Sequence, residues 1–191
     1  MPPEAVSLIQ AQNSFAQWAV RPYKAHGSQD RKRAALRQKG FIMKAVVTRV
    51  RSASVSIDGE LHGSIGQGFL ILLGIAPEDT PESCRKLAEK CLGLRVFRDE
   101  NDKMNLSLAD VGGSVLVVSQ FTLYGDVSHG RRPSFIGAAR PETAIPLYEQ
   151  FLSECTRLGF PPQHGEFGAY MQVESVNDGP VTLIVDTKDL K

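Results

Sequence analysis

The stretch MKAVVTRVRSASVSIDGELHGSIGQGFLILLGIA, residues 43–76, decides the fold because it contains three consecutive strand signals. The strands predicted within it cover residues 46–50, 54–57 and 69–75. The second alternates polar and apolar residues and the third is a continuous apolar run, patterns typical of half-buried and fully buried strands. Asp58-Gly59, between alternating stretches, is a strong hairpin signal. The glycines of GSIGQG precede a strand, whereas a phosphate-binding glycine loop follows one, so they predict a hairpin turn with a bulge.

Beyond residue 76 the chain predicts two helices and three more strands, which makes the fold class α/β in one strand-rich domain. One helix lies within residues 79–97, where Asp79 or Thr80 caps it, and the other within residues 141–159, with apolar side chains on one face. The remaining strands are predicted within residues 114–126, 167–176 and 181–187, with a loop over residues 98–113.

The cysteine and hydropathy patterns bear on the compartment and on membranes. The chain has three cysteines and no C-x-x-C pair, and Cys84 and Cys91 share one helix face with Leu87. We therefore expect buried free thiols rather than a disulfide or zinc site, which fits a reducing compartment. No apolar run approaches the roughly 18–20 residues that span a bilayer, so no membrane segment is predicted.

The first 42 residues differ in charge from the rest of the chain. They hold seven lysines and arginines against two acids, a net charge of +5, and leave −4 for the remainder of a chain whose net charge is +1. This extension, residues 1–42, fits a targeting peptide, a disordered nucleic-acid-binding arm, or an upstream read-through of a gene whose working start is Met43. The domain proper is predicted over residues 43–191, in the cytoplasm unless the extension directs it to an organelle.

Common hydrolase motifs are absent. The sequence has no G-x-S-x-G, no H-E-x-x-H and no G-x-x-x-x-G-K-[ST], and its four histidines have no metal-ligand spacing. We therefore predict neither a metal site nor a cofactor.

Polar residues at the end of an apolar strand form the first candidate site. Ser119, Gln120 and Thr122 end the run SVLVVSQFTLY, and burial of unpaired polar groups costs about 1–3 kcal/mol each. They either tie down neighbouring loops or face a ligand at the carboxyl end of the strand. Nearby, Arg131 and Arg132 form either an ordinary exposed loop or a contact for phosphate oxygens, which arginine binds bidentately.

Gly179-Pro180, in the stretch VNDGPVTLIVD, is the second candidate site. A bond before proline is the only peptide bond with a modest cost for the cis form, and glycine tolerates unusual backbone angles. A cis bond here would direct two carbonyl oxygens to one side, where they could bind an ammonium group. The alternative is a plain trans turn that leads into an edge strand.

Six motifs together carry a family resemblance. They are MKAVVTRV (43–50), KMNLS (103–107), SQFTLYGD (119–126), GRRPSF (130–135), FGAYMQV (167–173) and NDGPVT (177–182). From residue 43 to about residue 187 the chain closely resembles the D-aminoacyl-tRNA deacylase family, formerly called D-tyrosyl-tRNA deacylase. The resemblance implies a three-layer α/β/β fold and a homodimer with active sites at the subunit interface. It also implies hydrolysis of the ester that links a D-amino acid, or glycine mischarged on tRNA-Ala, to tRNA.

The resemblance also assigns the site residues. The family motif S-Q-x-x-L is matched by Ser119, Gln120 and Leu123, and N-x-G-P-x-T by Asn177, Gly179, Pro180 and Thr182. In the family the Gly-Pro bond is cis and reaches into the partner subunit's site, where its carbonyls hold the substrate α-amino group and exclude L side chains. Phe167 and Met171 match pocket-lining positions, and Arg49 matches a residue near the pocket.

Two mechanisms stay open at this point. In one, the 2′-hydroxyl of the terminal ribose assists hydrolysis and the backbone around Phe121 stabilises the oxyanion. In the other, Thr122 is a covalent nucleophile, although no base lies beside it in the sequence. Outside the deacylase hypothesis, the chain could be an acyl hydrolase that uses Thr122 or Ser119, or a non-enzymatic nucleic-acid-binding protein. His129 stands where the family often has lysine, which reduces the positive charge of the Arg131–Arg132 loop.

Overall fold

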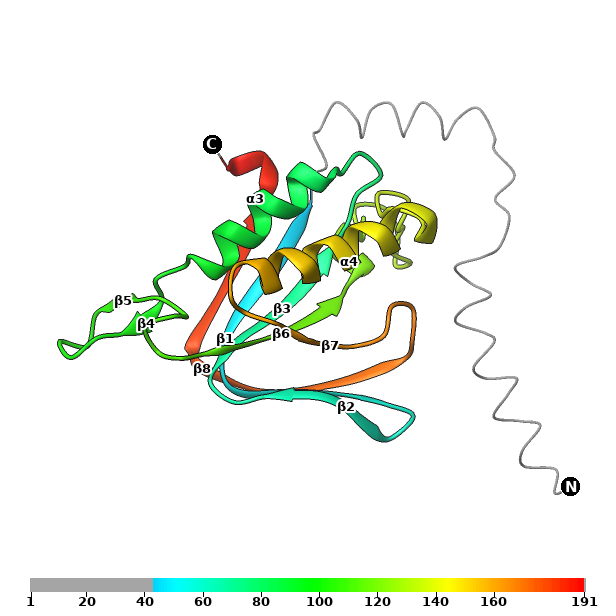
Figure 1. Ribbon diagram of the computed structural model, residues 1–191. Helices are drawn as coiled ribbons and strands as arrows, with labels where there is room; N and C mark the ends of the chain where they lie inside the picture. Colours follow the sequence, from blue (N-terminus) through cyan, green and yellow to red (C-terminus); the bar gives the residue numbers. More distant parts are fainter. Residues whose placement is uncertain (1–42, 191) are drawn as a thin grey trace, which may run out of the picture.

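The computed structural model describes residues 43–190, which form a mixed α/β fold of two helices and a six-stranded mixed sheet. Both helices lie on the same face of the sheet (Figure 1). The sheet order is β2-β1-β3-β6-β7, and β8 pairs with β1. The strands are β1 Lys44–Ile57, β2 Glu60–Ile65, β3 Gly68–Gly74, β6 Ser114–Ser119, β7 Gln163–His164 and β8 Met171–Asp186. The α/β class and the number of helices are thus confirmed.

The sheet curls until it is nearly barrel-shaped. Strands β2 and β7, at the two ends of the strand order, approach each other, and the Nδ1 atom of His62 lies 3.0 Å from the carbonyl oxygen of His164. Gly63 belongs to the same contact, because a methyl group there would lie 3.4 Å from the side chain of Gln163.

Strand β1 joins the whole sheet, and here one prediction was wrong. Two strands were predicted within residues 46–57, but β1 is continuous over Lys44–Ile57 and pairs with β2, β3 and β8. The polar pair Arg51-Ser52, which looks like a break in the sequence, only shifts the register and stays within the strand. The Asp58-Gly59 hairpin is confirmed, with φ of 51° and 82° at its two turn residues, and β2 is its second strand.

A turn is present within GSIGQG, where residues 66–67 connect β2 to β3, but the predicted hairpin is wrong because both strands pair with β1 and not with each other. Gly68 begins β3 at the point where the backbone of Ser114 approaches closest, and a side chain there would collide with the Ser114 carbonyl group. The glycine therefore permits the parallel pairing of β3 with β6.

Strand β8 corrects a second prediction. Residues 167–176 and 181–187 were predicted as separate strands with a turn between them, but β8 runs continuously over Met171–Asp186. The stretch 177–182 is an irregularity inside it, because Asn177 pairs with Val50 and Thr182 with Thr48. Only Arg49 of β1 lies opposite the four residues 178–181, so these residues form a wide bulge.

The two helices are α3, Pro81–Leu92, and α4, Pro141–Arg157. Thr80 rather than Asp79 is the N-cap of α3, in a capping box with Ser83. The predicted loop over residues 98–113 contains all but Phe97 of a small hairpin, which β4 (Phe97–Arg98) and β5 (Met104–Leu106) form beside the main sheet. Short 3-10 helices cover Phe121–Tyr124 and Thr187–Asp189.

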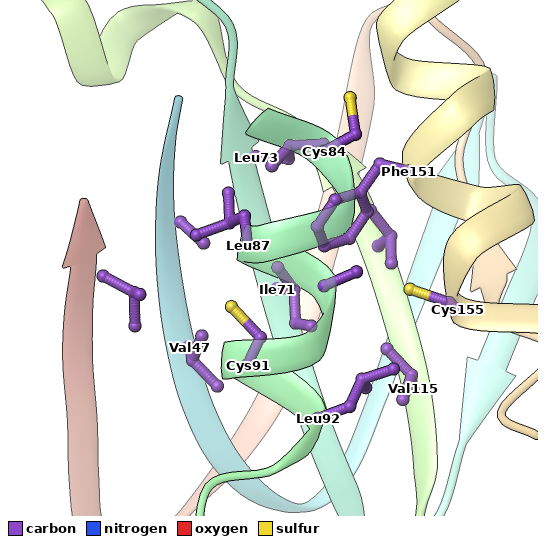
Figure 2. Close-up of a cluster of buried hydrophobic side chains, with 14 of the residues drawn as sticks. Val47, Ile71, Leu73, Cys84, Leu87, Cys91, Leu92, Val115, Phe151 and Cys155 are labelled. Carbon is purple, nitrogen blue, oxygen red and sulfur yellow. The ribbon is translucent and has the colours of Figure 1, made fainter. Parts of the chain in front are cut away.

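Two apolar cores occupy opposite faces of the sheet because successive side chains of a strand point to opposite sides. The larger core lies between the sheet and the helices, where Phe151 of α4 and Leu87 of α3 are fully buried beside Ile71 of β3 (Figure 2). The smaller core, on the other face, includes Leu70 and Leu116. All three cysteines of the chain are buried and free, as predicted.

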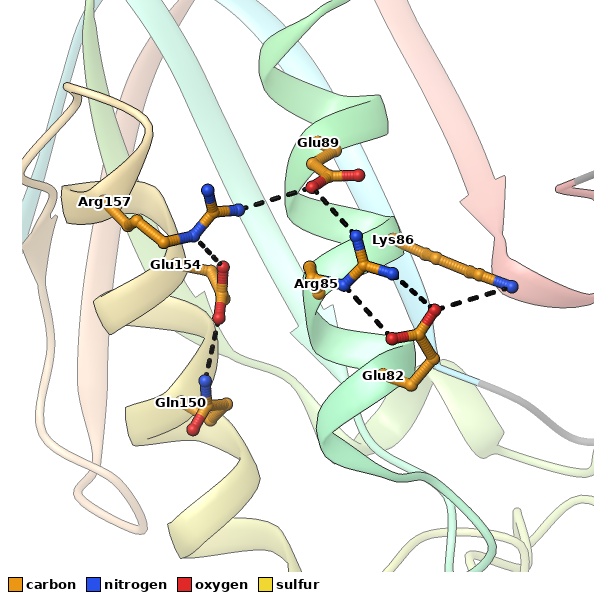
Figure 3. A network of polar contacts seen from close by, with 7 residues as sticks. All are labelled: Glu82, Arg85, Lys86, Glu89, Gln150, Glu154 and Arg157. Carbon is orange, nitrogen blue, oxygen red and sulfur yellow. Dashed lines mark hydrogen bonds and ion pairs between the residues drawn. The ribbon is translucent and has the colours of Figure 1, made fainter.

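The outer surfaces of α3 and α4 carry ion pairs, one of which joins the two helices. Arg157 of α4 contacts Glu89 of α3 at 3.3 Å and Glu154 at 2.6 Å, while Arg85 pairs with Glu82 at 2.6 Å (Figure 3). Exposed pairs of this kind contribute about 0–1 kcal/mol each, so the apolar core below them holds the helices in place.

Within residues 43–190 no helix is long and apolar enough to cross a membrane. The predictions for residues 1–42 fall outside the part of the chain that the structure describes.

Candidate functional site

The SQFT segment, residues 119–122, turns sharply where β6 ends. Ser119 is the last residue of the strand, and Phe121 begins the 3-10 helix that follows. The backbone N–H of Gln120 donates to the Leu73 carbonyl at 2.7 Å, which continues the strand pairing by one residue. A methyl group on Gly74 would lie 3.0 Å from the ring of Tyr124, so this glycine lets the turn lie close to the end of β3.

The side chains of this turn face partly outward. The amide of Gln120 donates a short hydrogen bond to the hydroxyl of Thr122, and Thr122 is exposed. Phe121 is 40% exposed and meets the ring of Phe135 edge-on, with 5.2 Å between the ring centroids. The predicted position of these polar side chains at the carboxyl end of a strand is confirmed, whereas their roles stay predictions.

Arg131 and Arg132 lie in the loop that follows this turn. Asp126 and Ser134 close the loop with two backbone hydrogen bonds of 2.7 and 2.9 Å. Both arginines are exposed, and Gly130 before them adopts a φ of 69° that favours glycine. Phe135, at the end of the loop, brings it beside Phe121. The loop therefore presents two cations next to the SQFT segment.

The bulge at residues 177–182 forms the second cluster. The Gly179-Pro180 bond is cis, as predicted. Asn177 braces the bulge, because its Nδ2 donates to the Thr182 hydroxyl at 3.1 Å and its Oδ1 accepts from the Val181 N–H at 3.2 Å. The Thr182 hydroxyl also lies 3.3 Å from that of Thr48 on β1.

Arg49 lies beneath the bulge with only 2% of its side chain exposed. Its Nε donates to the Asp178 carbonyl at 3.1 Å and lies equally close to a carboxylate oxygen of Asp178. Its Nη1 donates a short hydrogen bond to the Val96 carbonyl. A methyl group on Gly179 would lie 2.8 Å from Nη2, so the guanidinium fills the space beside the glycine.

Phe167 and Met171 belong to the packing of the fold. Phe167 packs on the helix-side core, where its ring centroid lies 5.9 Å from that of Tyr148. Met171 starts β8 and packs against the smaller core, and a side chain on Gly165 would collide with its sulfur atom. Their assignment to the pocket lining stays a prediction.

The two clusters lie at opposite ends of the sheet. Ser119 of β6 pairs with Leu73 of β3, whereas the bulge lies opposite Arg49, whose neighbour on β3 is Phe69. Four residues along β6 and three strand spacings separate them, which corresponds to roughly 20 Å measured along the sheet. One chain therefore does not bring the SQFT segment and Gly179-Pro180 together.

Asp79 is a buried carboxylate near the SQFT segment, and the sequence analysis predicted it only as a possible helix cap. Asp79 is 8% exposed and accepts from the N–H groups of Met43 at 2.6 Å and Ala76 at 2.7 Å. Burial raises the pKa of this carboxyl to about 6, against the effect of the two hydrogen bonds. Burial, with Asp79 and Asp186 nearby, also raises the pKa of the Tyr124 phenol.

Asp178 was missed for a different reason. It is the variable residue of N-x-G-P-x-T, and the only signal for it in the sequence is a charged residue next to Gly179 inside a strand region. Among residues 43–190, no group of three or more histidine, cysteine or acidic side chains is placed to hold a metal ion.

The sequence of this chain is similar to those of known proteins. The family model described as D-Tyr-tRNA(Tyr) deacylase matches residues 46–186. A D-aminoacyl-tRNA deacylase of Desulfatibacillum aliphaticivorans is 58% identical over 146 residues, which cover 76% of this chain and 100% of that relative. The corresponding protein of Thermus aquaticus is 54% identical over 147 residues, with 77% and 97% covered.

Two solved structures share the fold. The c-Myc DNA unwinding element binding protein superposes with a TM-score of 0.71 at 44% identity, over 75% of this chain and 97% of that one. A probable eukaryotic D-amino acid tRNA deacylase superposes with a TM-score of 0.66 over 75% and 98%. At 17% identity, this second likeness shows the fold alone.

Proposed function

Because this chain belongs to the D-aminoacyl-tRNA deacylase family and is an ester hydrolase, we propose that it proofreads chirality with a site built from two subunits. The substrate is a tRNA that carries a D-amino acid on its 3′-terminal adenosine, and the products are the free amino acid and tRNA. Glycine mischarged on tRNA-Ala is a second substrate, because glycine has no side chain for the chiral filter to exclude.

The observation that carries this proposal is the separation of the two motifs within one chain. Ser119 and Gly179-Pro180 lie roughly 20 Å apart across the sheet, too far to contact one aminoacyl group. A two-fold dimer solves this, because each subunit can place its bulge at the SQFT segment of the other. The exposed apolar residues Val173, Val176 and Ile184 of β8 support an interface along this strand.

Recognition of the substrate is divided between the two clusters. The carbonyl oxygens of Gly179 and Pro180 accept hydrogen bonds from the substrate α-ammonium group, and the hydrogen atom on the α-carbon faces the protein wall. An L side chain would occupy that wall position. Arg131 and Arg132 bind phosphate oxygens of the tRNA end, which fits their exposure next to Phe121.

The chemistry is hydrolysis by water at the ester carbonyl. Backbone donors around Phe121 stabilise the oxyanion, and the ribose 2′-hydroxyl assists transfer of the proton from water to the departing 3′-oxygen. The protein itself contributes orientation. The hydrogen bond from Gln120 to the Thr122 hydroxyl supports this route over a covalent one, because the partner in that bond is an amide donor and not a base.

The proposal includes the bounds of the catalytic domain and its layer architecture. Residues 43–191 form the catalytic domain and residues 1–42 an extension, since the family model begins at residue 46. The architecture is three-layer α/β/β, and the apolar cores on both faces of the sheet support this description.

A paired deacylation assay tests the proposal. D-Tyr-tRNA and L-Tyr-tRNA are incubated with the full chain, and the remaining charged tRNA is measured over time. We expect rapid loss of D-Tyr from tRNA and retention of L-Tyr. Equal hydrolysis of both substrates, or of neither, would contradict chiral proofreading. A fully active protein that sediments as a monomer under the assay conditions would contradict the shared site.

A nucleic-acid-binding role is the second candidate, favoured by the 44% identity to a protein named for binding a DNA unwinding element. Because this likeness covers 75% of the chain, it predicts a chain starting at Met43 that binds nucleic acid and hydrolyses neither substrate, whereas the deacylase proposal predicts unchanged hydrolysis by that chain. The same paired assay on both forms distinguishes the two.

A further inference from the structure

The geometry of the bulge assigns a role to Asp178, and we infer that it is a specificity-determining positioning residue. Its carboxylate neutralises buried Arg49 and so fixes the path of Gly179-Pro180, on which discrimination between D and L substrates depends. This inference rests on the proposed function and goes beyond it, because that function assigns the substrate contacts to the carbonyls of Gly179 and Pro180 and none to Asp178.

The first observation is the charge of Arg49. Its side chain is 2% exposed, and a buried guanidinium requires both hydrogen-bond acceptors and a counter-charge. Two of its hydrogen bonds go to backbone carbonyls, those of Asp178 and Val96, and these are neutral groups. Within residues 43–190, Asp178 is the only acid in an ion pair with Arg49.

The second observation is that Asp178 binds two arginines from β1. One carboxylate oxygen lies 3.1 Å from Nε of Arg49, and the other lies 3.3 Å from Nε of Arg51. The two partners differ in burial, since the side chain of Arg51 is 77% exposed. Screening by water weakens the contact to Arg51, so the interaction with Arg49 dominates.

The third observation is the position of the pair inside the bulge. Residues 178–181 lie opposite Arg49 alone, so strand pairing does not hold them in place. Asn177 braces the bulge from within, whereas Arg49 is the buried one of the two β1 arginines that join Asp178 to the rest of the sheet. The Nη2 atom of Arg49 also fills the space beside Gly179. A shift of the guanidinium therefore moves the wall against which Gly179 rests.

These contacts predict a loss of specificity rather than of folding. Without the carboxylate, Arg49 keeps its backbone acceptors but lacks its counter-ion, and it will turn toward water. The bulge then loses its fixed position relative to β1. A less defined carbonyl pair binds the D substrate less well and excludes the L substrate less strictly, so the ratio of the two rates falls.

The test uses the full chain with Asp178→Asn, which keeps the shape and removes the charge. The measured quantity is kcat/KM for D-Tyr-tRNA divided by kcat/KM for L-Tyr-tRNA. We expect this ratio to fall about tenfold or more, mostly through a higher KM for the D substrate and a newly measurable rate on the L substrate. Arg51→Gln should leave the ratio within about threefold of wild type.

Glu82→Gln serves as the matched control. It removes an acid from an acid–arginine pair on the outer surface of α3 (Figure 3), and neither member of that pair contacts the bulge in a hydrogen bond or ion pair of the described residues. Its ratio should equal that of the wild type. If Asp178→Asn does not fold, Asp178→Glu decides the question, because it keeps the charge but moves it by one methylene group. An unchanged ratio in the folded Asp178 variant would overturn the inference, even if its melting temperature falls.

The wild-type protein separates this inference from the proposed function. A wild type that discriminates, together with an Asp178→Asn variant that discriminates equally, overturns the role of Asp178 alone. A wild type without discrimination overturns the proposed function and this inference with it.

Discussion

The two clusters of polar residues differ in how the fold holds them. The SQFT segment follows directly from a buried strand, and backbone contacts to Leu73 and Gly74 fix its position. The bulge at residues 177–182 has no such support, and side chains hold it instead, through Asn177 from within and Arg49 from β1. The comparison teaches that side-chain changes should disturb the bulge far more than the SQFT turn.

The largest effect is expected for Gly179→Ala. The added methyl group would lie 2.8 Å from Arg49 Nη2 and 2.9 Å from Val181 Cγ2, at a φ of 124° that L side chains rarely adopt. We expect kcat/KM on D-Tyr-tRNA to fall by about 100-fold, because small misplacements of substrate-positioning groups cost this much. Steady-state kinetics with the purified variant measure it.

Gly59→Ala is the matched control for this change. Gly59 also has a positive φ, 82°, but open space surrounds it in the β1–β2 turn. This variant tests backbone strain without the clash and should keep its activity. Equal losses in the two variants would show that general destabilisation, rather than the bulge, causes the effect.

A pH-dependent change in stability is the next largest effect, at the SQFT end. The pKa of Asp79 is raised from 3.8 to about 6 by burial, so its charged form is disfavoured in the folded state. The contribution of protonated Asp79 to the free energy of unfolding is therefore fully present below pH 3.8 and is lost as the pH rises through about 6. The free energy of unfolding of wild type relative to Asp79→Asn should fall by about 2–3 kcal/mol over this interval.

Chemical denaturation of both proteins at several pH values between 4 and 7 checks this expectation. A constant difference across the interval would mean that the Asp79 carboxylate is ionised throughout. Deacylation at neutral pH should change little, because Asp79 contacts the backbone of Met43 and Ala76 and not the SQFT side chains.

Asn177→Ala should have a smaller effect on activity. The substitution removes the hydrogen bonds to Thr182 and Val181, each with a net contribution of about 1 kcal/mol at an exposed site. We expect about a tenfold lower kcat/KM on D-Tyr-tRNA. Thr182→Ser keeps the hydroxyl acceptor and should remain close to wild type, so a similar loss in both variants would contradict a bracing role for Asn177.

The smallest effect is expected for Thr122→Ala. The Thr122 hydroxyl is exposed and accepts from the Gln120 amide, and its removal leaves the backbone of the turn in place. Deacylation should stay within about threefold of wild type if water attacks the ester directly. A loss of about 1,000-fold, restored by Thr122→Ser, would instead establish a covalent role for the hydroxyl.

The same contrast between local and distant contacts explains what the sequence could predict. Helices α3 and α4 and the Asp58-Gly59 hairpin depend on neighbours within a few residues, and their positions were predicted correctly. The cis bond at Gly179-Pro180 was also predicted, but from the family resemblance and not from the local pattern.

The continuity of β1 and β8 could not be predicted from local patterns. Arg51-Ser52 and the Asn-Asp-Gly-Pro stretch both resemble the end of a strand. Each lies inside a strand because β1 and β8 pair with each other on both sides of it. Asp178 was missed because its main partner, Arg49, lies 129 residues away in the sequence. Cross-strand register of this kind depends on the whole sheet.

The three buried thiols can report how often the two helices move away from the sheet. Cys84 and Cys91 lie on α3 and Cys155 on α4, and burial raises the pKa of the Cys84 thiol to about 12. A thiol-reactive reagent can therefore modify them only while a helix is lifted from the sheet. Mass spectrometry of the wild-type chain therefore measures the rate of these openings as the rate of thiol modification. The measurement can be made with and without aminoacyl-tRNA.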